Sequence, residues 1–154
     1  MNKENSILNG PPITILLVED EPAHAEIVRR NLSAFPVAHR LIHVGDGQMA
    51  LDYLLRQEGY ADPVCSPRPE LILLDLRLPK VDGLEVLRQI KSSRDLETIP
   101  TVVLTTSATD SDLAAAYSLG ARSYQLKPAN FEGFTELLDT NYRPASGKQR
   151  VSHE

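Results

Sequence analysis

The sequence predicts a doubly wound α/β domain, built on a parallel sheet of five strands with helices on both faces. Short apolar runs alternate along the chain with segments whose apolar residues recur at helical spacing. Several runs are almost continuously apolar, which is typical of strands buried on both faces of a parallel sheet. The strands are expected at residues 13–18, 40–44, 71–74, 101–104 and 123–126.

The polarity of the strands predicts their order. The strands at 40–44 and 123–126 contain polar residues inside their runs, namely Arg40, His43, Ser123 and Gln125, whereas the other three are almost wholly apolar. Polar strands belong at the edges of a sheet, which gives the order 2-1-3-4-5. In that order the chain reverses its direction of winding between the first and third strands, and ligands bind at such a point.

Amphipathic segments between the strands predict five helices. The first begins at Pro22, since proline is favoured in the first helical turn, and extends to Phe35, because Pro36 cannot continue it. The second follows Gly47, and its expected core-facing residues are Ala50, Leu51, Leu54 and Leu55. The other three follow Gly83, Asp110 or Ser111, and Asn130.

Length and composition limit the function classes. The chain of 154 residues fits one domain at 13–142, with an N-terminal extension at 1–12, a C-terminal tail at 143–154 and a long proline-containing loop at 58–70. A net charge of −5 gives no electrostatic reason to expect nucleic-acid or membrane binding. A single cysteine, Cys65, excludes an internal disulfide, and we expect a cytoplasmic protein because no signal peptide or apolar span is present.

Polar side chains follow the apolar strands at the points where the strands end. These are Glu19 and Asp20 after the first, Asp75 after the third, Thr105 after the fourth and Lys127 after the fifth. The carboxyl ends of parallel strands meet at one edge, where open sheets bind their ligands. The sequence therefore predicts that three carboxylates, a hydroxyl and an amine converge on one site.

Clustered carboxylates favour a divalent cation. Two carboxylates 4 Å apart repel each other by about 4 kcal/mol at an effective dielectric constant of 20, and a bound cation relieves this repulsion. Oxygen ligands without histidine or cysteine favour a hard ion, which in this setting indicates Mg²⁺. The alternative is that the acidic segment 19–21 only caps a helix. The four histidines share no ligand spacing and are expected at surface or space-filling positions.

A carboxylate beside Mg²⁺ can act as a nucleophile toward phosphorus. Asp75 is the best candidate, because its strand is the most apolar and the most central. The Lys127 ammonium group would neutralise the transferring oxygens and the Thr105 hydroxyl would bind the attached group, although alone Lys127 fits a surface lysine and Thr105 an ordinary strand end. Three other classes of phosphate-binding protein are excluded because this chain lacks the residues they need. A flavodoxin needs a hydroxyl-rich loop after the first strand, and a dehalogenase-type phosphatase needs an acid at the position of Arg77. The sequence also contains no P-loop.

Four segments carry a resemblance to a known family: 17–20, 73–79 with Asp82-Gly83, 104–107 and 124–128. Asp75 precedes Thr105 by 30 positions, and Thr105 precedes Lys127 by 22. In these motifs and spacings, residues 13–142 resemble the receiver domain of two-component response regulators. The resemblance implies a CheY-like (βα)₅ fold and a signalling protein, not an enzyme, that accepts a phosphoryl group from a sensor histidine kinase.

The resemblance also implies roles for individual residues. Asp75 would be the phosphoacceptor, and Mg²⁺ would be held by Asp20, Asp75, Glu19 directly or through water, and the main-chain carbonyl of Arg77. Lys127 would contact the phosphoryl oxygens, and Thr105 with Tyr124 would form the conformational switch. The segments 66–76 and 102–107 and the long loop are similar to stand-alone regulators of phytochrome-type kinases, which makes a bacteriophytochrome the expected partner.

Two further points concern the quaternary structure and the alternative function. A stand-alone regulator signals through its own surface, and we expect a homodimer through the helix at 111–119, the strand at 123–126, the last helix and the C-terminal tail. The alternative function is a phosphorylation-independent, receiver-like scaffold or dimerisation module. The complete set of site residues argues against this alternative.

Overall fold

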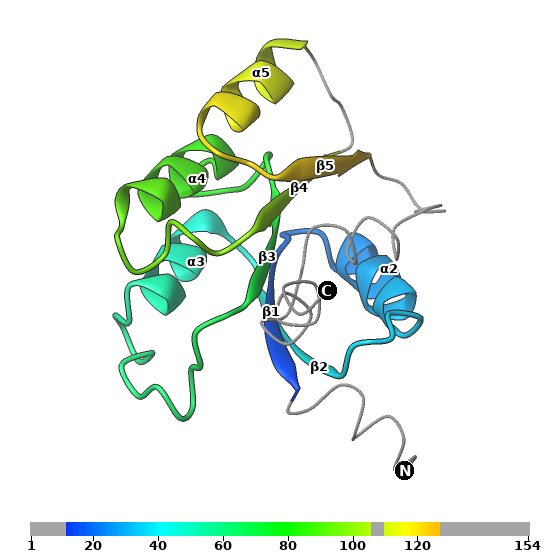
Figure 1. Ribbon diagram of the computed structural model, residues 1–154, viewed down its shortest axis with the longest axis vertical. Coiled ribbons are helices and arrows are strands. Elements are labelled where there is room, and N and C mark those ends of the chain that lie inside the picture. Colours follow the sequence, from blue (N-terminus) through cyan, green and yellow to red (C-terminus); the bar gives the residue numbers. More distant parts are fainter. Residues whose placement is uncertain (1–11, 106–109, 127–154) are drawn as a thin grey trace, which may run out of the picture.

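The computed structural model describes residues 12–105 and 110–126 (Figure 1). A five-stranded parallel sheet comprises β1 (Ile13–Val18), β2 (His39–Val44), β3 (Leu71–Asp75), β4 (Thr101–Thr105) and β5 (Ser123–Leu126). Its order is β2-β1-β3-β4-β5, which confirms the predicted class and strand order. No helix among the described residues is long and apolar enough to cross a membrane.

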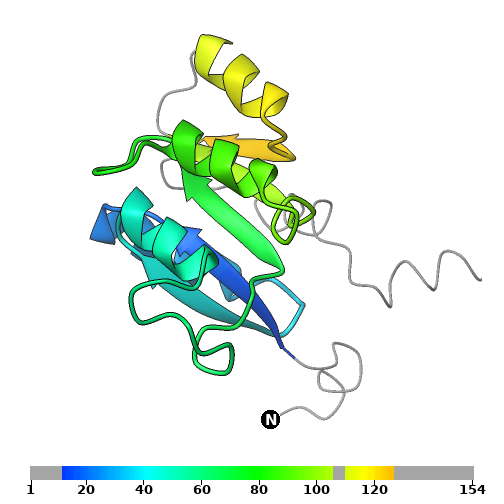
Figure 2. The same ribbon diagram turned by 90° about the vertical axis from the view of Figure 1, so that its left-hand side faces the viewer.

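Helices cover both faces of the sheet. Helix α2 (Pro22–Leu32) lies on one face, and α3 (Gly47–Leu54), α4 (Gly83–Ser92) and α5 (Asp110–Ser118) lie on the other (Figures 1 and 2). Alternate residues of β1 serve the two cores: Ile15 and Leu17 pack on the α2 side, whereas Leu16 and Val18 pack toward α3 and α4. This two-sided burial explains why the β1 sequence is almost continuously apolar. The expected last helix and C-terminal tail lie outside the described residues.

Helix α2 ends earlier than predicted. It stops at Leu32, and the Ser33 N–H donates to the carbonyl oxygens of Arg30 and Asn31. The Phe35 N–H donates to the Leu32 carbonyl at 2.9 Å, so the chain turns tightly there while the Phe35 side chain stays buried. The apolar residue at position 35 therefore indicated a buried side chain, but that side chain belongs to a turn and not to a longer helix.

The loop at 58–70 changes which residues of α3 are buried. Leu55, predicted to be in the core, is exposed, whereas Tyr53 is buried and donates its hydroxyl to the Pro67 carbonyl at 2.6 Å. Arg68 donates to the Leu54 carbonyl at 2.7 Å. At the end of the loop, the Thr14 N–H donates to the Glu70 carboxylate at 2.7 Å. The loop is thus tied to both α3 and β1.

Two glycines allow the segment after β3 to pack closely against its neighbours. A Cβ atom on Gly83 would lie 2.3 Å from the Asp75 carbonyl oxygen, and one on Gly47 would lie 1.9 Å from the Val81 carbonyl oxygen. The Gly47 N–H also donates to the Pro79 carbonyl at 3.2 Å. The backbone that leaves Asp75 is therefore held between the starts of α3 and α4.

We predict that Gly83→Ala destabilises the protein by about 1–3 kcal/mol, because the added methyl group must displace the backbone at Asp75. Gly45→Ala is the matched control, since a Cβ atom there meets nothing within 4 Å. Urea denaturation measures both variants. Equal midpoints for Gly83→Ala and Gly45→Ala would contradict the close packing.

Candidate functional site

Three predicted acidic side chains meet at the carboxyl end of the sheet. The register pairs Val18 of β1 with Leu74 of β3, so the next residues, Glu19 and Asp75, stand at the same level. One carboxylate oxygen each from Glu19, Asp20 and Asp75 lies within 4.8 Å of the other two. Glu19 and Asp75 are buried, and Asp20 is exposed, so the cluster opens to solvent on one side.

Hydrogen bonds fix Glu19 in this cluster. Its Oε2 atom accepts the Glu21 N–H at 3.1 Å and lies 3.7 Å from Nδ1 of His24. Its carbonyl oxygen lies 2.7 Å from Nε2 of His43, and because a carbonyl only accepts, that ring nitrogen donates. His43 is exposed and His24 is half-buried, and each also contacts Glu19, which the sequence did not predict. The His43 contact joins residues 24 positions apart, so no local pattern signals it.

The capping alternative for segment 19–21 explains only part of this arrangement. Glu21 is the N-cap of α2, but its side chain makes no capping hydrogen bond. The Glu19 carboxylate accepts the Glu21 N–H instead, and it also faces Asp75 across the sheet. A capping role does not require a second buried carboxylate from β3.

Asp75 lies at the centre of the site. Strand β3 runs between β1 and β4, and the Oδ1 atom of Asp75 accepts the N–H of Arg77 at 3.2 Å. Two carboxylates 4.8 Å apart repel each other by about 3.5 kcal/mol at an effective dielectric constant of 20. Three such groups, all with oxygen ligands, suit a hard divalent cation.

Of the other predicted site residues, Thr105 lies at the same edge, Tyr124 lies within β5, and Lys127 lies outside the described residues. Thr105 ends β4, one position beyond Leu104, which pairs with Asp75. Tyr124 of β5 is exposed, and its ring meets that of Tyr117 on α5 edge to face, with 6.3 Å between centroids. Lys127 follows the last residue of β5 and lies outside the described residues.

Arg77 makes a contact that the sequence did not predict. Its guanidinium group pairs with the carboxylate of Asp112 in the first turn of α5. The two residues are 35 positions apart. Its main-chain carbonyl, the predicted metal ligand, belongs to the segment that Gly47 and Gly83 hold in place.

Comparison with known proteins shows the family of this chain. A model of the response regulator receiver domain matches residues 15–139. The chain belongs to the response regulator receiver family. Receiver domains are signalling domains, and the predicted family is thereby confirmed.

The similar proteins include regulators from Synechocystis and from Methanothrix. Response regulator Rcp1 of Synechocystis sp. is 44% identical over 130 residues, which cover 84% of this chain and 86% of Rcp1. The probable methanogenesis regulatory protein FilR2 of Methanothrix harundinacea is 50% identical over 128 residues, which cover 83% of this chain and 80% of FilR2.

Two solved structures share the fold. The Mn²⁺-bound form of Rcp1 has a TM-score of 0.73 at 43% identity and covers 84% of this chain and 91% of that one. The phosphorylated cyanobacterial phytochrome response regulator RcpA has a TM-score of 0.74 at 39% identity, with the same two coverages of 84% and 91%. These matches confirm the resemblance of this receiver to phytochrome-associated regulators.

A divalent cation should stabilise this receiver, because it relieves the repulsion among the three carboxylates. A ligand that binds only the folded state at 100 times its Kd adds about 2.7 kcal/mol to the free energy of unfolding. The melting temperature should therefore rise on titration with MgCl₂ or MnCl₂. Asp20→Asn should raise the metal-free melting temperature and reduce the response to metal.

Asp95→Asn provides the control for net charge. Asp95 is exposed in the segment between α4 and β4, and that segment leads into the opposite end of the sheet. This variant should respond to metal as the wild type does. Equal responses of Asp20→Asn and Asp95→Asn would contradict the assignment of the acidic cluster as the cation site.

Proposed function

We propose that this chain is a response regulator that accepts a phosphoryl group on Asp75 from a sensor histidine kinase in a Mg²⁺-dependent reaction. The observation that supports this proposal most strongly is the buried Asp75 carboxylate, which lies within 4.8 Å of the carboxylates of Glu19 and Asp20. Such a cluster can hold a cation beside a nucleophilic carboxylate, as phosphoryl transfer requires. The receiver domain spans residues 13–142 in this proposal, in a cytoplasmic protein.

The reaction is an exchange of one phosphorus bond for another. An Asp75 oxygen attacks the phosphorus atom of the kinase's phosphohistidine, the P–N bond breaks as the new P–O bond forms, and the imidazole nitrogen retains the electron pair. Glu19, Asp20, Asp75 and the Arg77 carbonyl would hold Mg²⁺, which when bound neutralises charge on the transferring oxygens. Lys127 adds a second positive charge there.

Thr105 and Tyr124 would transmit the change. The attached phosphoryl group carries roughly −1.5 to −2 charge and accepts hydrogen bonds, so it favours the state in which Thr105 turns toward it. Tyr124 would then move inward into the space that Thr105 vacates. The exposed position of the Tyr124 ring, against Tyr117, is consistent with the unphosphorylated state.

The kinase partner is proposed from the relatives. Rcp1 shares 44% identity with this chain, and RcpA is named as a phytochrome response regulator. We therefore propose a phytochrome-type histidine kinase, such as a bacteriophytochrome, as the phosphodonor. The alternative function, a phosphorylation-independent scaffold, would make Asp75 dispensable.

Replacement of the phosphoacceptor provides the direct test. The full-length protein should gain the mass of one phosphoryl group when it is incubated with acetyl phosphate and Mg²⁺, as measured by intact mass spectrometry. Asp75→Asn should remove this gain, because an amide is a poor nucleophile, while circular dichroism shows an unchanged fold. Asp95→Asn should label like the wild type. Labelling of Asp75→Asn to the wild-type extent would contradict the proposal.

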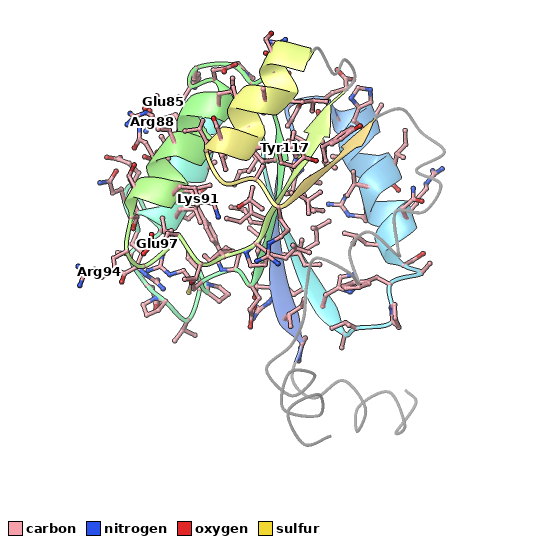
Figure 3. All side chains as sticks on the ribbon, turned by 45° about the horizontal axis from the view of Figure 1, so that its top comes forward. Glu85, Arg88, Lys91, Arg94, Glu97 and Tyr117 are labelled. Atoms are coloured by element: carbon pink, nitrogen blue, oxygen red, sulfur yellow. The ribbon has the colours of Figure 1, made fainter. Side chains whose placement is uncertain are left out.

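A homodimer is proposed through α5, β5 and the segments that follow. Two aromatic side chains are exposed side by side on this surface: Tyr117 is 45% exposed and Tyr124 is 36% exposed, and Figure 3 shows Tyr117 on α5. Burial, and then the neighbouring Tyr124, raise the pKa of the Tyr117 hydroxyl.

Light scattering should give a dimeric mass for the full chain at micromolar concentration. A chain that ends at Pro144 should dissociate more readily, because the tail contributes to the interface. Tyr117→Glu should do the same by placing a charge in it. Monomeric masses for all three proteins, with and without a phosphoryl mimic, would contradict the dimer.

A further inference from the structure

Arg77 connects the phosphoacceptor to α5. Its backbone N–H donates to Oδ1 of Asp75 at 3.2 Å, while its guanidinium group pairs with the carboxylate of Asp112. Asp112 lies in the first turn of α5. One residue therefore contacts both the proposed phosphorylation site and a helix of the proposed output surface.

Helix α5 is held by few buried side chains. Among its residues whose burial is described, 111–118, only Ala116 is buried, whereas α4 buries Gly83, Val86, Leu87 and Ile90. The Tyr117 ring packs against Tyr124 on the outside of the domain. With so little apolar burial, the position of α5 is sensitive to contacts of its polar side chains.

The Arg77 guanidinium group is free to exchange one anion for another. Its side chain is 57% exposed, so it can reorient through solvent, while its backbone stays next to Asp75. Phosphorylation of Asp75 places an anion next to the Arg77 backbone. This anion carries a charge of roughly −1.5 to −2 and has several acceptor oxygens. A guanidinium group matches phosphate oxygens in geometry and binds them through two hydrogen bonds.

We infer that Arg77 changes partners with the phosphorylation state. It pairs with Asp112 when Asp75 is unmodified, and with the phosphoryl oxygens when Asp75 is phosphorylated. The exchange removes this contact from the first turn of α5 and gives the site a second connection to the output surface, independent of Thr105 and Tyr124. This inference rests on the proposed phosphorylation of Asp75, and it makes Arg77 and Asp112 positioning residues for α5.

Amide hydrogen exchange over residues 110–118 tests the connection in the full-length protein. In the unmodified state, Asp112→Asn and Arg77→Gln should each accelerate exchange there by about two- to fivefold, as expected for loss of a surface ion pair. The double variant should exchange no faster than either single variant. Beryllofluoride with Mg²⁺ as a phosphoryl mimic should accelerate exchange in the wild type and change the three variants much less.

The double variant separates the ion pair from a simpler effect. An acid in the first turn also stabilises a helix through its dipole, so Asp112→Asn weakens α5 to some extent without Arg77. If that were the whole effect, Asp112→Asn would accelerate exchange equally in the Arg77→Gln background, which would overturn the inference. Glu85→Gln is the matched control, because it breaks an exposed pair with Arg88 on α4 (Figure 3) and should leave α5 unchanged.

Labelling of the same proteins by acetyl phosphate distinguishes the two proposals. Labelled wild-type protein whose exchange at 110–118 is unaffected by beryllofluoride would overturn the partner exchange alone. Absence of labelling in the wild type would overturn the proposed function and the partner exchange with it. Labelling together with accelerated exchange in the wild type, and little further change in Asp112→Asn, is the expected result.

Discussion

The parallel register of β1 and β3 brings like charges together, and the remainder of the site depends on that constraint. The pairing of Val18 with Leu74 places the following residues, Glu19 and Asp75, at one level, and both are buried. Their separation cannot increase without a change in the central strand pair, which is packed on both faces. The repulsion among the carboxylates is therefore built into the fold, and a cation or a positively charged side chain is the natural means of offsetting it.

This arrangement of buried acids lowers the stability of the fold. Two acids buried at the end of an apolar core are less stable than apolar residues of similar size would be. The apolar strands compensate, because β1 and β3 contribute side chains to the cores on both faces of the sheet. The site is thus rigid on the β1–β3 side and lightly held on the α5 side, which suits a protein whose surface must respond to a local change of charge.

The sequence predicted the sheet and the acidic cluster because both follow from strand polarity and from the meeting of parallel strand ends. It could not predict contacts that depend on how turns and loops fold. Phe35 is buried in a turn, and Tyr53 replaces Leu55 in the core because the 58–70 loop returns to α3. The His43 contact with Glu19 crosses between strands, and the Arg77–Asp112 pair spans 35 positions, so neither leaves a local pattern.

We propose that the clustered acids make Asp75 a cation-dependent phosphoacceptor, and chemical trapping tests this proposal at the level of the single residue. An acyl phosphate is reduced by borohydride, which converts a phosphorylated aspartate to homoserine at its position in the chain. After incubation with acetyl phosphate, peptide mass spectrometry should find homoserine at position 75, with Mg²⁺ present and not with a chelator. Homoserine at another aspartate, or an equal yield at position 75 without a divalent cation, would contradict the account.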